Sequence, residues 1–147
     1  MIALVQRVVE ARVEIEGRVR GAIGRGILRF VCAEPDDSDA TADKLVDKVL
    51  KLRVFADAVG KMNLDLASVD GGLLIVSQFT LAADTSSGNR PGFSGAARPE
   101  HGKRIYERVL ASASVRHKVV ANGEFGADMQ VHLVNDGPVT IPLVVRS

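Results

Sequence analysis

Two short apolar segments constrain the fold of this chain more than any other feature. Residues 27–33 (ILRFVCA) and 73–76 (LLIV) are runs of apolar residues that contain one charge, Arg29. Runs of this length without alternating polarity are typical of strands that are covered on both faces. An amphipathic stretch lies between them, with apolar residues near helical spacing. The pattern therefore predicts a buried sheet that is covered by helices.

The flanking segments complete a mixed α/β pattern. Strands are expected within residues 2–33, with a hairpin turn at Gly17-Arg18, and the strand at 73–76 is expected to run into residues 77–81. Helices are expected at 39–57 and from Pro99 onward, and loops at 34–38, 60–63 and 84–99. Three more strands are expected at 115–121, 129–134 and 139–145. This order predicts a single α/β domain over residues 1–147, with two main helices packed on one face of a mixed sheet.

Composition excludes several classes of protein. The chain has 147 residues, of which 46% are apolar and 25% charged, as in a soluble globular domain. Its net charge of +1 gives no global attraction to nucleic acid or membrane, so such a partner needs a local patch. The longest uncharged apolar stretches are about five residues, far short of the ~20 that a membrane helix needs. A single cysteine and the absence of a signal-peptide pattern predict a cytoplasmic protein.

Common catalytic sets are missing from the sequence. The histidines His101, His117 and His132 have no metal-ligand spacing, and we find no P-loop, no GxSxG and no GxGxxG followed by a helix. We therefore expect neither a metal nor a cofactor. Cys32 lies within an apolar run, which favours a buried inert thiol over a nucleophile.

Two polar segments remain as candidate sites. Ser77-Gln78-Phe79-Thr80 follows a buried strand, and backbone N–H groups at such a strand end can form an oxyanion hole; the alternative is an ordinary polar strand end. Residues 135–140 (NDGPVT) are either a turn between two strands or a special backbone segment, since a Gly-Pro bond can be cis. In the loop 84–99, Arg90 and Phe93 are a weak signal for RNA contact.

Together these segments resemble one family, the D-aminoacyl-tRNA deacylases, also called D-Tyr-tRNA deacylases. The resemblance covers essentially the whole chain, in the shared order and spacing of VQRV (5–8), IGRG (23–26), LRVF (52–55), GKMN (60–63), SQFTL (77–81), FGADM (125–129) and NDGPVT (135–140). Three positions depart from the family pattern. Ser87 replaces a lysine, Gly92 replaces a common serine, and Cys32 stands where glycine is more usual. These departures bear on tRNA affinity more than on chemistry.

The resemblance implies a barrel-like, layered fold and a homodimer. It also implies that the protein hydrolyses the ester between a D-amino acid and the 3′-terminal adenosine of tRNA. Ser77, Gln78, Phe79 and Thr80 would lie at the ester, and Gly137 with a cis Pro138 would reach into the partner's site and exclude L side chains. Glycine has no side chain to exclude, so glycyl-tRNA would be a further substrate. The resemblance also assigns Arg7, Met129, Asn135, Val139 and Thr140 to the pocket or this gate, and Arg90 and Phe93 to tRNA contact.

Several alternatives remain open at this stage. We favour a water molecule activated by the ribose 2′-OH, with an oxyanion bound by the N–H groups of Phe79 and Thr80; the alternative is Thr80 as a covalent nucleophile, for which no base is evident. Arg7 could instead be an ordinary surface arginine, and Met129 an ordinary core residue. The rival functions are a non-catalytic tRNA-binding module, a hydrolase of small esters or N-acyl amino acids that uses Thr80, and a purely structural dimer. Neither DNA nor a membrane is expected as a partner.

Overall fold

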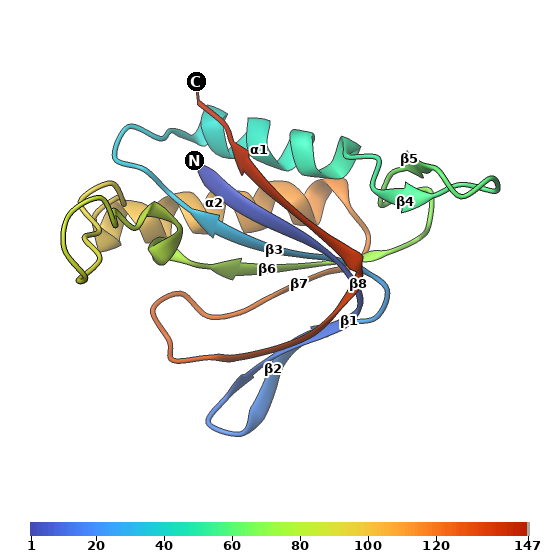
Figure 1. Ribbon diagram of the computed structural model, residues 1–147, viewed down its shortest axis with the longest axis horizontal. Coiled ribbons are helices and arrows are strands. Elements are labelled where there is room, and N and C mark those ends of the chain that lie inside the picture. Colours follow the sequence, from blue (N-terminus) through green and yellow to red (C-terminus); the bar gives the residue numbers. More distant parts are fainter. Residues whose placement is uncertain (147) are drawn as a thin grey trace.

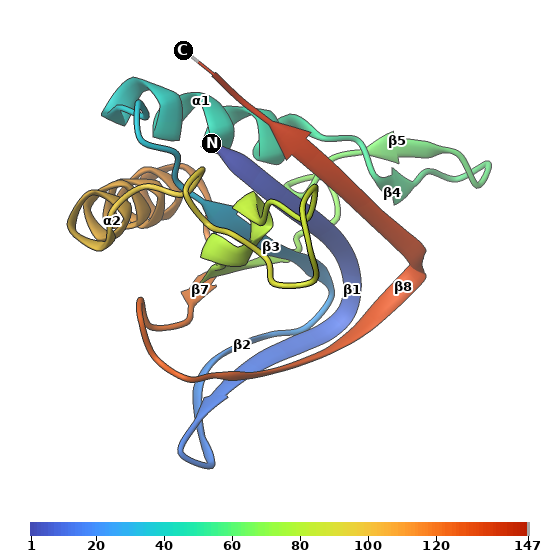
Figure 2. The ribbon, with the colours of Figure 1, turned by 60° about the vertical axis from the view of Figure 1, so that its left-hand side comes forward.

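Strand β1 (Ile2–Ile15) is the centre of the sheet in the computed structural model, which describes residues 1–146. One edge of β1 pairs with β8 (Gln130–Val144). The other edge pairs first with β3 (Gly26–Cys32) and then with β2 (Arg18–Ile23), and all three pairings are antiparallel. Because β1 passes from one partner to the next along its length, it curves strongly, as Figure 2 shows.

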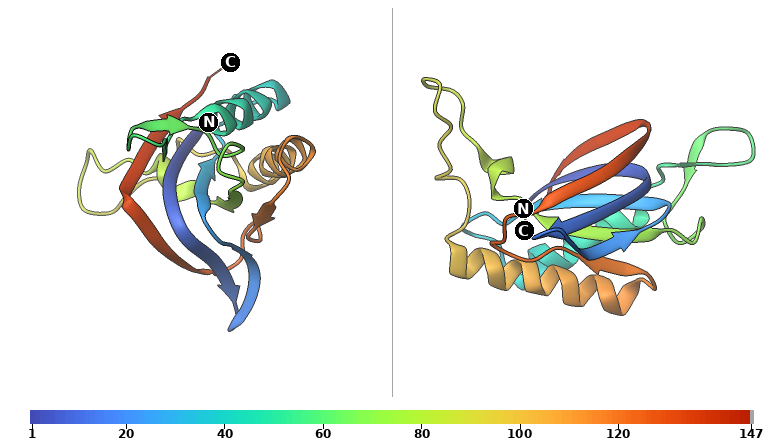
Figure 3. Two further views of the ribbon diagram at one scale, coloured as in Figure 1. Left: turned by 90° about the vertical axis from the view of Figure 1, so that its right-hand side faces the viewer. Right: turned by 90° about the horizontal axis from the view of Figure 1, so that it is seen from below.

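The other half of the sheet is parallel. Strand β6 (Gly72–Ser77) lies between β3 and β7 (Val120–Asn122), and it runs parallel to both. The connections are the helices α1 (Asp39–Lys51) and α2 (Pro99–Arg116), which cover the same face of the sheet (Figures 1 and 3). The expected mixed α/β domain with two helices on one face is therefore confirmed.

The curved sheet encloses two hydrophobic clusters. The larger one lies between the sheet and the helices and includes Leu45, Ile75 and Val109. The smaller one lies in the curved half and includes Val8 and Leu74. Strands β2 and β7 come so close that a Cβ atom on Gly21 would lie 2.6 Å from the carbonyl oxygen of Asn122. The sheet thus approaches closure, which confirms the expected barrel-like, layered fold.

Local sequence signals set several boundaries correctly. Ser38 caps α1 through a reciprocal pair of hydrogen bonds with Thr41, and Pro99 opens α2. The expected β1–β2 hairpin is present, but its turn lies one residue earlier than the expected Gly17-Arg18. Glu16 (51°) and Gly17 (77°) both have the positive φ that a type I′ hairpin turn requires, and Arg18 already begins β2.

Other expected boundaries were wrong. The helix expected at 39–57 ends at Lys51, because the chain becomes extended at Leu52 and then forms a small hairpin of β4 (Phe55–Ala56) and β5 (Met62–Leu64). Residues 60–63, for which a loop is expected, lie partly in this hairpin, since β5 begins at Met62. The strand expected at 115–121 is mostly absent, since α2 continues to Arg116 with Val115 exposed, and only β7 remains. The strand expected to run into 77–81 ends at Ser77, and a 3₁₀ helix, η1 (Phe79–Ala82), follows.

The two strands expected at 129–134 and 139–145 are halves of the single strand β8. Both halves pair with the same edge of β1, but residues 136–139 have no partner there and bulge outward opposite Arg7. The Gly137-Pro138 bond within the bulge is cis. This segment is therefore not a turn that reverses the chain between two strands. Within residues 1–146, no helix is long and apolar enough to cross a membrane.

Candidate active site

The candidate site lies at the carboxyl ends of the parallel strands β3 and β6, where α/β sheets commonly bind ligands. Strand β6 is buried up to Val76 and emerges at the half-buried Ser77. The backbone N–H of Gln78 still donates to the carbonyl of Val31 in β3, at 2.8 Å. Beyond this last contact the chain turns into η1, so the sheet fixes the point at which the polar segment begins.

The turn from β6 into η1 leaves two backbone N–H groups without intrahelical acceptors. The first N–H of η1 with such an acceptor is that of Leu81, which donates to the carbonyl of Gln78 at 3.2 Å. The preceding N–H groups belong to Phe79 and Thr80, and no side chain caps them. The amide of Gln78 instead donates to the hydroxyl oxygen of Thr80. A negatively charged oxygen placed here would meet two free donors.

An open groove of about 560 Å³ adjoins this turn. Its walls are mainly aromatic and apolar side chains, and the rings of Phe79 and Phe93 meet edge to face with their centroids 5.1 Å apart. Ser77, Gln78, Phe125 and Met129 also line it. Phe79 remains 57% exposed, so its ring is free to contact a bound molecule.

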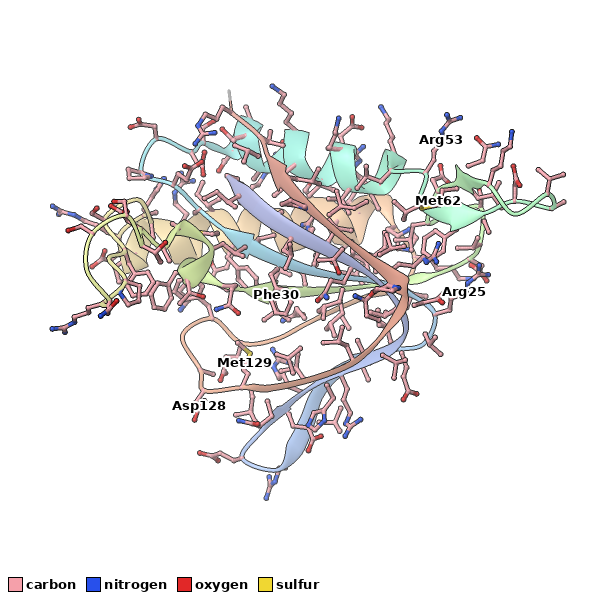
Figure 4. All side chains as sticks on the ribbon, in the orientation of Figure 1. Arg25, Phe30, Arg53, Met62, Asp128 and Met129 are labelled. Carbon is pink, nitrogen blue, oxygen red and sulfur yellow. The ribbon has the colours of Figure 1, made fainter. Side chains whose placement is uncertain are left out.

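No side chain of the described groove is placed as a general base. None of the lining residues is a histidine, and the only charged one is Asp128. Asp128 is exposed, and Figure 4 shows its side chain turned outward while that of Met129 turns toward the curved interior. His101 and His117 hydrogen-bond to the carbonyls of Asp37 and Gly71 elsewhere in the molecule. A reaction in this groove that needs a general base must therefore obtain it from elsewhere.

The β8 bulge forms a second cluster. Arg7 donates from Nε to the carbonyl of Asp136 (3.0 Å) and from Nη1 to the carbonyl of Val54 (2.7 Å), which ties the bulge to the start of the β4–β5 hairpin. At the neck of the bulge, the Asn135 side chain donates to the Thr140 hydroxyl at 2.8 Å and accepts the N–H of Val139 at 3.2 Å. Arg7 is thus an anchor of this segment rather than a free surface arginine.

Glycine is required at position 137. Its φ of +132° is rare for L side chains, and an added Cβ would lie 2.9 Å from Cγ2 of Val139 and 3.0 Å from Nη2 of Arg7. The bulge therefore presents bare backbone at its tip.

The two clusters do not meet within one chain. Figure 1 shows η1 at one end of the sheet and the bend of β8 at the other. The groove collects Ser77, Gln78, Phe79, Phe93 and Met129 from the expected site, while Thr80 follows in η1 and Arg90 is exposed on the adjoining loop. Gly137, Pro138, Arg7, Asn135, Val139 and Thr140 lie at the bulge. Phe125 was not expected in the site, and its place before Gly126 in the FGADM segment was the one signal for it.

A second groove, of about 490 Å³, crosses β1, β2 and β8 and contains none of the expected residues. The Arg12 guanidinium and the His132 ring both lie beside the Glu14 carboxylate, at 2.8 and 3.0 Å, and Glu10 also lines the groove. The side chains of Arg12, Glu14 and His132 largely satisfy one another, so the groove beside η1, which contains the expected residues, remains the candidate site. Among residues 1–146, no group of three or more His, Cys, Asp or Glu side chains could hold a metal ion.

Comparison with known proteins identifies the family. The family model described as D-Tyr-tRNA(Tyr) deacylase matches residues 4–144. A D-aminoacyl-tRNA deacylase of Methylibium petroleiphilum is 68% identical over 145 residues, which cover 99% of this chain and 95% of the relative. The enzyme of the same name from Aromatoleum aromaticum is 64% identical over 143 residues, which cover 97% of this chain and 94% of the relative. The chain therefore belongs to the D-Tyr-tRNA(Tyr) deacylase family, and the family and enzyme class expected from the sequence are confirmed.

Solved structures agree with this fold. One described as a probable eukaryotic D-amino acid tRNA deacylase matches with a TM-score of 0.87, 16% identity and 97% coverage of each chain. Another, described as the c-Myc DNA Unwinding Element Binding Protein, matches with a TM-score of 0.94, 38% identity and 100% coverage of each chain.

Proposed function

We propose that this protein hydrolyses the ester bond of D-aminoacyl-tRNA and releases the free D-amino acid and tRNA. The proposal rests on family membership together with one structural observation, the two free N–H groups of Phe79 and Thr80 beside an aromatic groove. Ester hydrolysis passes through a tetrahedral oxyanion, and fixed backbone donors stabilise that charge without reorganisation. The exposed rings of the groove suit the terminal adenosine, which they would contact by stacking.

The attacking group in this proposal is a water molecule assisted by the substrate. The ribose 2′-OH next to the ester relays a proton. It accepts a proton from the water as the water attacks the carbonyl carbon, and its own proton passes to the 3′-oxygen as the bond between that oxygen and the carbonyl carbon breaks. The lack of a placed base in the groove supports this route. It also disfavours the Thr80 hydroxyl as nucleophile, because its neighbour is the neutral amide of Gln78.

Chiral selection in this proposal needs a second copy of the chain. The bulge cannot serve its own groove, but β8 pairs only with β1 among the described strands, so its other edge is free. We place the β8 strands of two chains side by side and antiparallel, with the two-fold axis close to Leu133. In this arrangement, residues 137–138 of one chain lie beside residue 129 of the other. The exposed side chain of Val134 (49%) would then be covered. The gate backbone would block an L side chain but not a D side chain, and glycyl-tRNA would escape exclusion.

We further propose that Arg90 and Phe93 contact the tRNA near its 3′ end. Arg90 lies in the loop that Asp84 and Gly92 close through paired backbone hydrogen bonds of 2.7 and 2.9 Å, and Phe93, which lines the groove, directly follows that loop.

A deacylation time course on matched D-tyrosyl-, L-tyrosyl- and glycyl-tRNA tests the function. We expect fast release from the D ester, slow release from the L ester and release from the glycyl ester. A D-tyrosyl-tRNA with a 2′-deoxy terminal adenosine should react far more slowly. Full activity on that substrate, together with a complete loss in Thr80→Ala, would favour the hydrolase with a Thr80 nucleophile. Binding of tRNA without hydrolysis would favour the non-catalytic module.

Light scattering after size-exclusion chromatography tests the dimer. A purely monomeric protein that still discriminates between D and L esters would refute the cross-subunit gate. Duplex DNA serves as the binding control, because no affinity for DNA is expected.

A further inference from the structure

The side chain of Cys32 touches the backbone that carries the proposed oxyanion donors. Cys32 is the last residue of β3 and is 2% exposed. Its Sγ lies 3.5 Å from the carbonyl oxygen of Phe79 and 3.4 Å from that of Ala33. The Ala33 carbonyl also accepts the N–H of Ala97 at 2.9 Å. The thiol has one proton to donate, and the contact that concerns the site is the one to the Phe79 carbonyl.

One peptide unit links this contact to the groove. The carbonyl of Phe79 and the N–H of Thr80 belong to the same planar trans peptide, so they point in opposite directions. With the carbonyl directed at the buried thiol, the N–H of Thr80 is directed away from the end of β3. A hydrogen bond to the carbonyl also polarises the peptide and strengthens its N–H as a donor.

The surroundings keep the thiol able to donate. Burial raises the pKa of Cys32, and the nearby carboxylate of Glu34 raises it further. The Ala82 N–H and the Met1 ammonium oppose this rise with smaller contributions, and Asp37 adds the smallest one. The sulfur therefore keeps its proton at neutral pH. Between Cys32, Ser77 and Phe79 there remains a cavity of only about 30 Å³, so the side chain also fills the space behind the turn.

We propose that Cys32 is a positioning residue that holds the Phe79–Thr80 peptide with its N–H aimed at the substrate oxyanion. This inference rests on the proposed function, because it assigns a purpose to the same N–H group. Cys32 takes no covalent part in the reaction.

Three variants test the proposal by steady-state hydrolysis of D-tyrosyl-tRNA. Cys32→Ala removes the donor and should lower kcat about three- to tenfold, as expected for one weak hydrogen bond, with KM within about twofold of wild type. Cys32→Ser restores a donor and should return kcat to within about twofold. Tyr106→Phe is the control, because it removes a buried hydroxyl from the wall of the same small cavity without touching Phe79. It should leave kcat within about twofold.

Each outcome decides the matter. A folded Cys32→Ala with wild-type kcat, a loss that appears in KM alone, or an equal loss in Tyr106→Phe would overturn the positioning role. If Cys32→Ala does not fold, Cys32→Ser decides, since a loss beyond threefold in the folded serine variant contradicts the proposal. Wild-type protein that leaves D-tyrosyl-tRNA intact would refute the proposed function and this inference with it. An active wild type with an unimpaired alanine variant refutes this inference alone.

Discussion

Replacing Arg29 with methionine is expected to stabilise the protein, because Arg29 is a charged side chain buried without a partner. Arg29 lies in β3 between Val5 of β1 and Ile75 of β6, and it is fully buried. Neighbouring residues of a strand point to opposite faces of the sheet, and Leu28 faces the smaller hydrophobic cluster. The Arg29 side chain therefore points to the other face, toward the helices. None of its three guanidinium nitrogens has a hydrogen-bond partner within residues 1–146.

The expected gain follows from the cost of taking the guanidinium out of water. Burial lowers the pKa of Arg29 by more than three units from its ordinary value, to about 9, against a smaller opposing contribution from Tyr106. At about 1.4 kcal/mol per pKa unit, this difference sets an upper limit of about 5 kcal/mol on the cost of the charge. Hydrophobic replacements of buried charged groups typically gain about 1–4 kcal/mol. We expect a gain of about 2–4 kcal/mol at pH 7, which should raise Tm by about 5–15 °C in a chain of this size.

Urea unfolding at several pH values tests both the gain and its origin. Because the folded-state pKa of Arg29 lies below the unfolded-state value, the unfolded chain holds a proton from about pH 9 up to the ordinary pKa of arginine that the folded chain has lost. Wild-type stability therefore rises with pH relative to Arg29→Met across this window. The difference in free energy of unfolding between Arg29→Met and wild type is therefore largest below about pH 9 and becomes smaller above it.

An exposed arginine provides the control for this prediction. Arg20→Met, in β2, should change the free energy of unfolding by less than about 0.5 kcal/mol. A folded Arg29→Met no more stable than wild type at pH 7 would refute the reasoning. So would a gain that stays constant up to pH 10.5.

Three further predictions concern separate parts of the molecule. Gly102→Ala in α2 should raise the free energy of unfolding by about 0.5–1 kcal/mol, because alanine favours the helix and the new Cβ would meet the Phe125 ring at an ordinary contact distance of 3.4 Å. A lower free energy of unfolding in urea would show that the Phe125 ring leaves no room for this Cβ. Asp37→Asn should lower the free energy of unfolding by about 1–3 kcal/mol, because Asp37 accepts from the buried ammonium of Met1 and from the N–H of Glu34, and thermal unfolding would show it as a lower Tm. Thr80→Ala should keep most of its kcat on D-tyrosyl-tRNA, since the backbone N–H survives the change, and a collapse of kcat in the folded variant would restore the nucleophile hypothesis.

The sequence predicted the elements that carry a local signal or a long apolar run, and it missed several whose extent depends on packing. The β1–β2 hairpin and the start of α1 carry their own turn and cap residues, so both could be located from the chain alone, the turn to within one residue. The β4–β5 hairpin has strands of only two and three residues, too short for a periodic pattern to show. The strand expected at 115–121 followed from β-branched residues, but Val115 is an exposed residue in the last turn of α2. Helix packing on the sheet overrode that local preference.

The two halves of β8 show a different limit of sequence reasoning. Residues 129–134 and 139–145 were recognised as strands, and the Gly-Pro pair between them as special. A turn that reverses the chain and a bulge within one strand favour similar residue types. Only the pairing of both halves with β1 distinguishes the bulge from the turn. Arg7 gives the physical reason for the bulge, because its guanidinium binds the carbonyl of Asp136 from the strand opposite. That contact joins residues far apart in sequence and has no local signature.

The candidate site was difficult to derive from residue types because its proposed working groups belong to the backbone. The oxyanion donors are N–H groups that every residue except proline possesses, and the proposed gate consists of carbonyls and a glycine without a side chain. A search for histidines, paired carboxylates or metal ligands therefore finds nothing at this site. What the sequence does record is the set of residues that force the backbone into position, such as the glycine at 137 that alone tolerates its φ, and the arginine at 7 that ties the bulge down. Cys32 is a further residue of this kind if Cys32→Ala lowers kcat and Cys32→Ser restores it. That result would show that a side chain of β3 helps to hold the oxyanion donors in position.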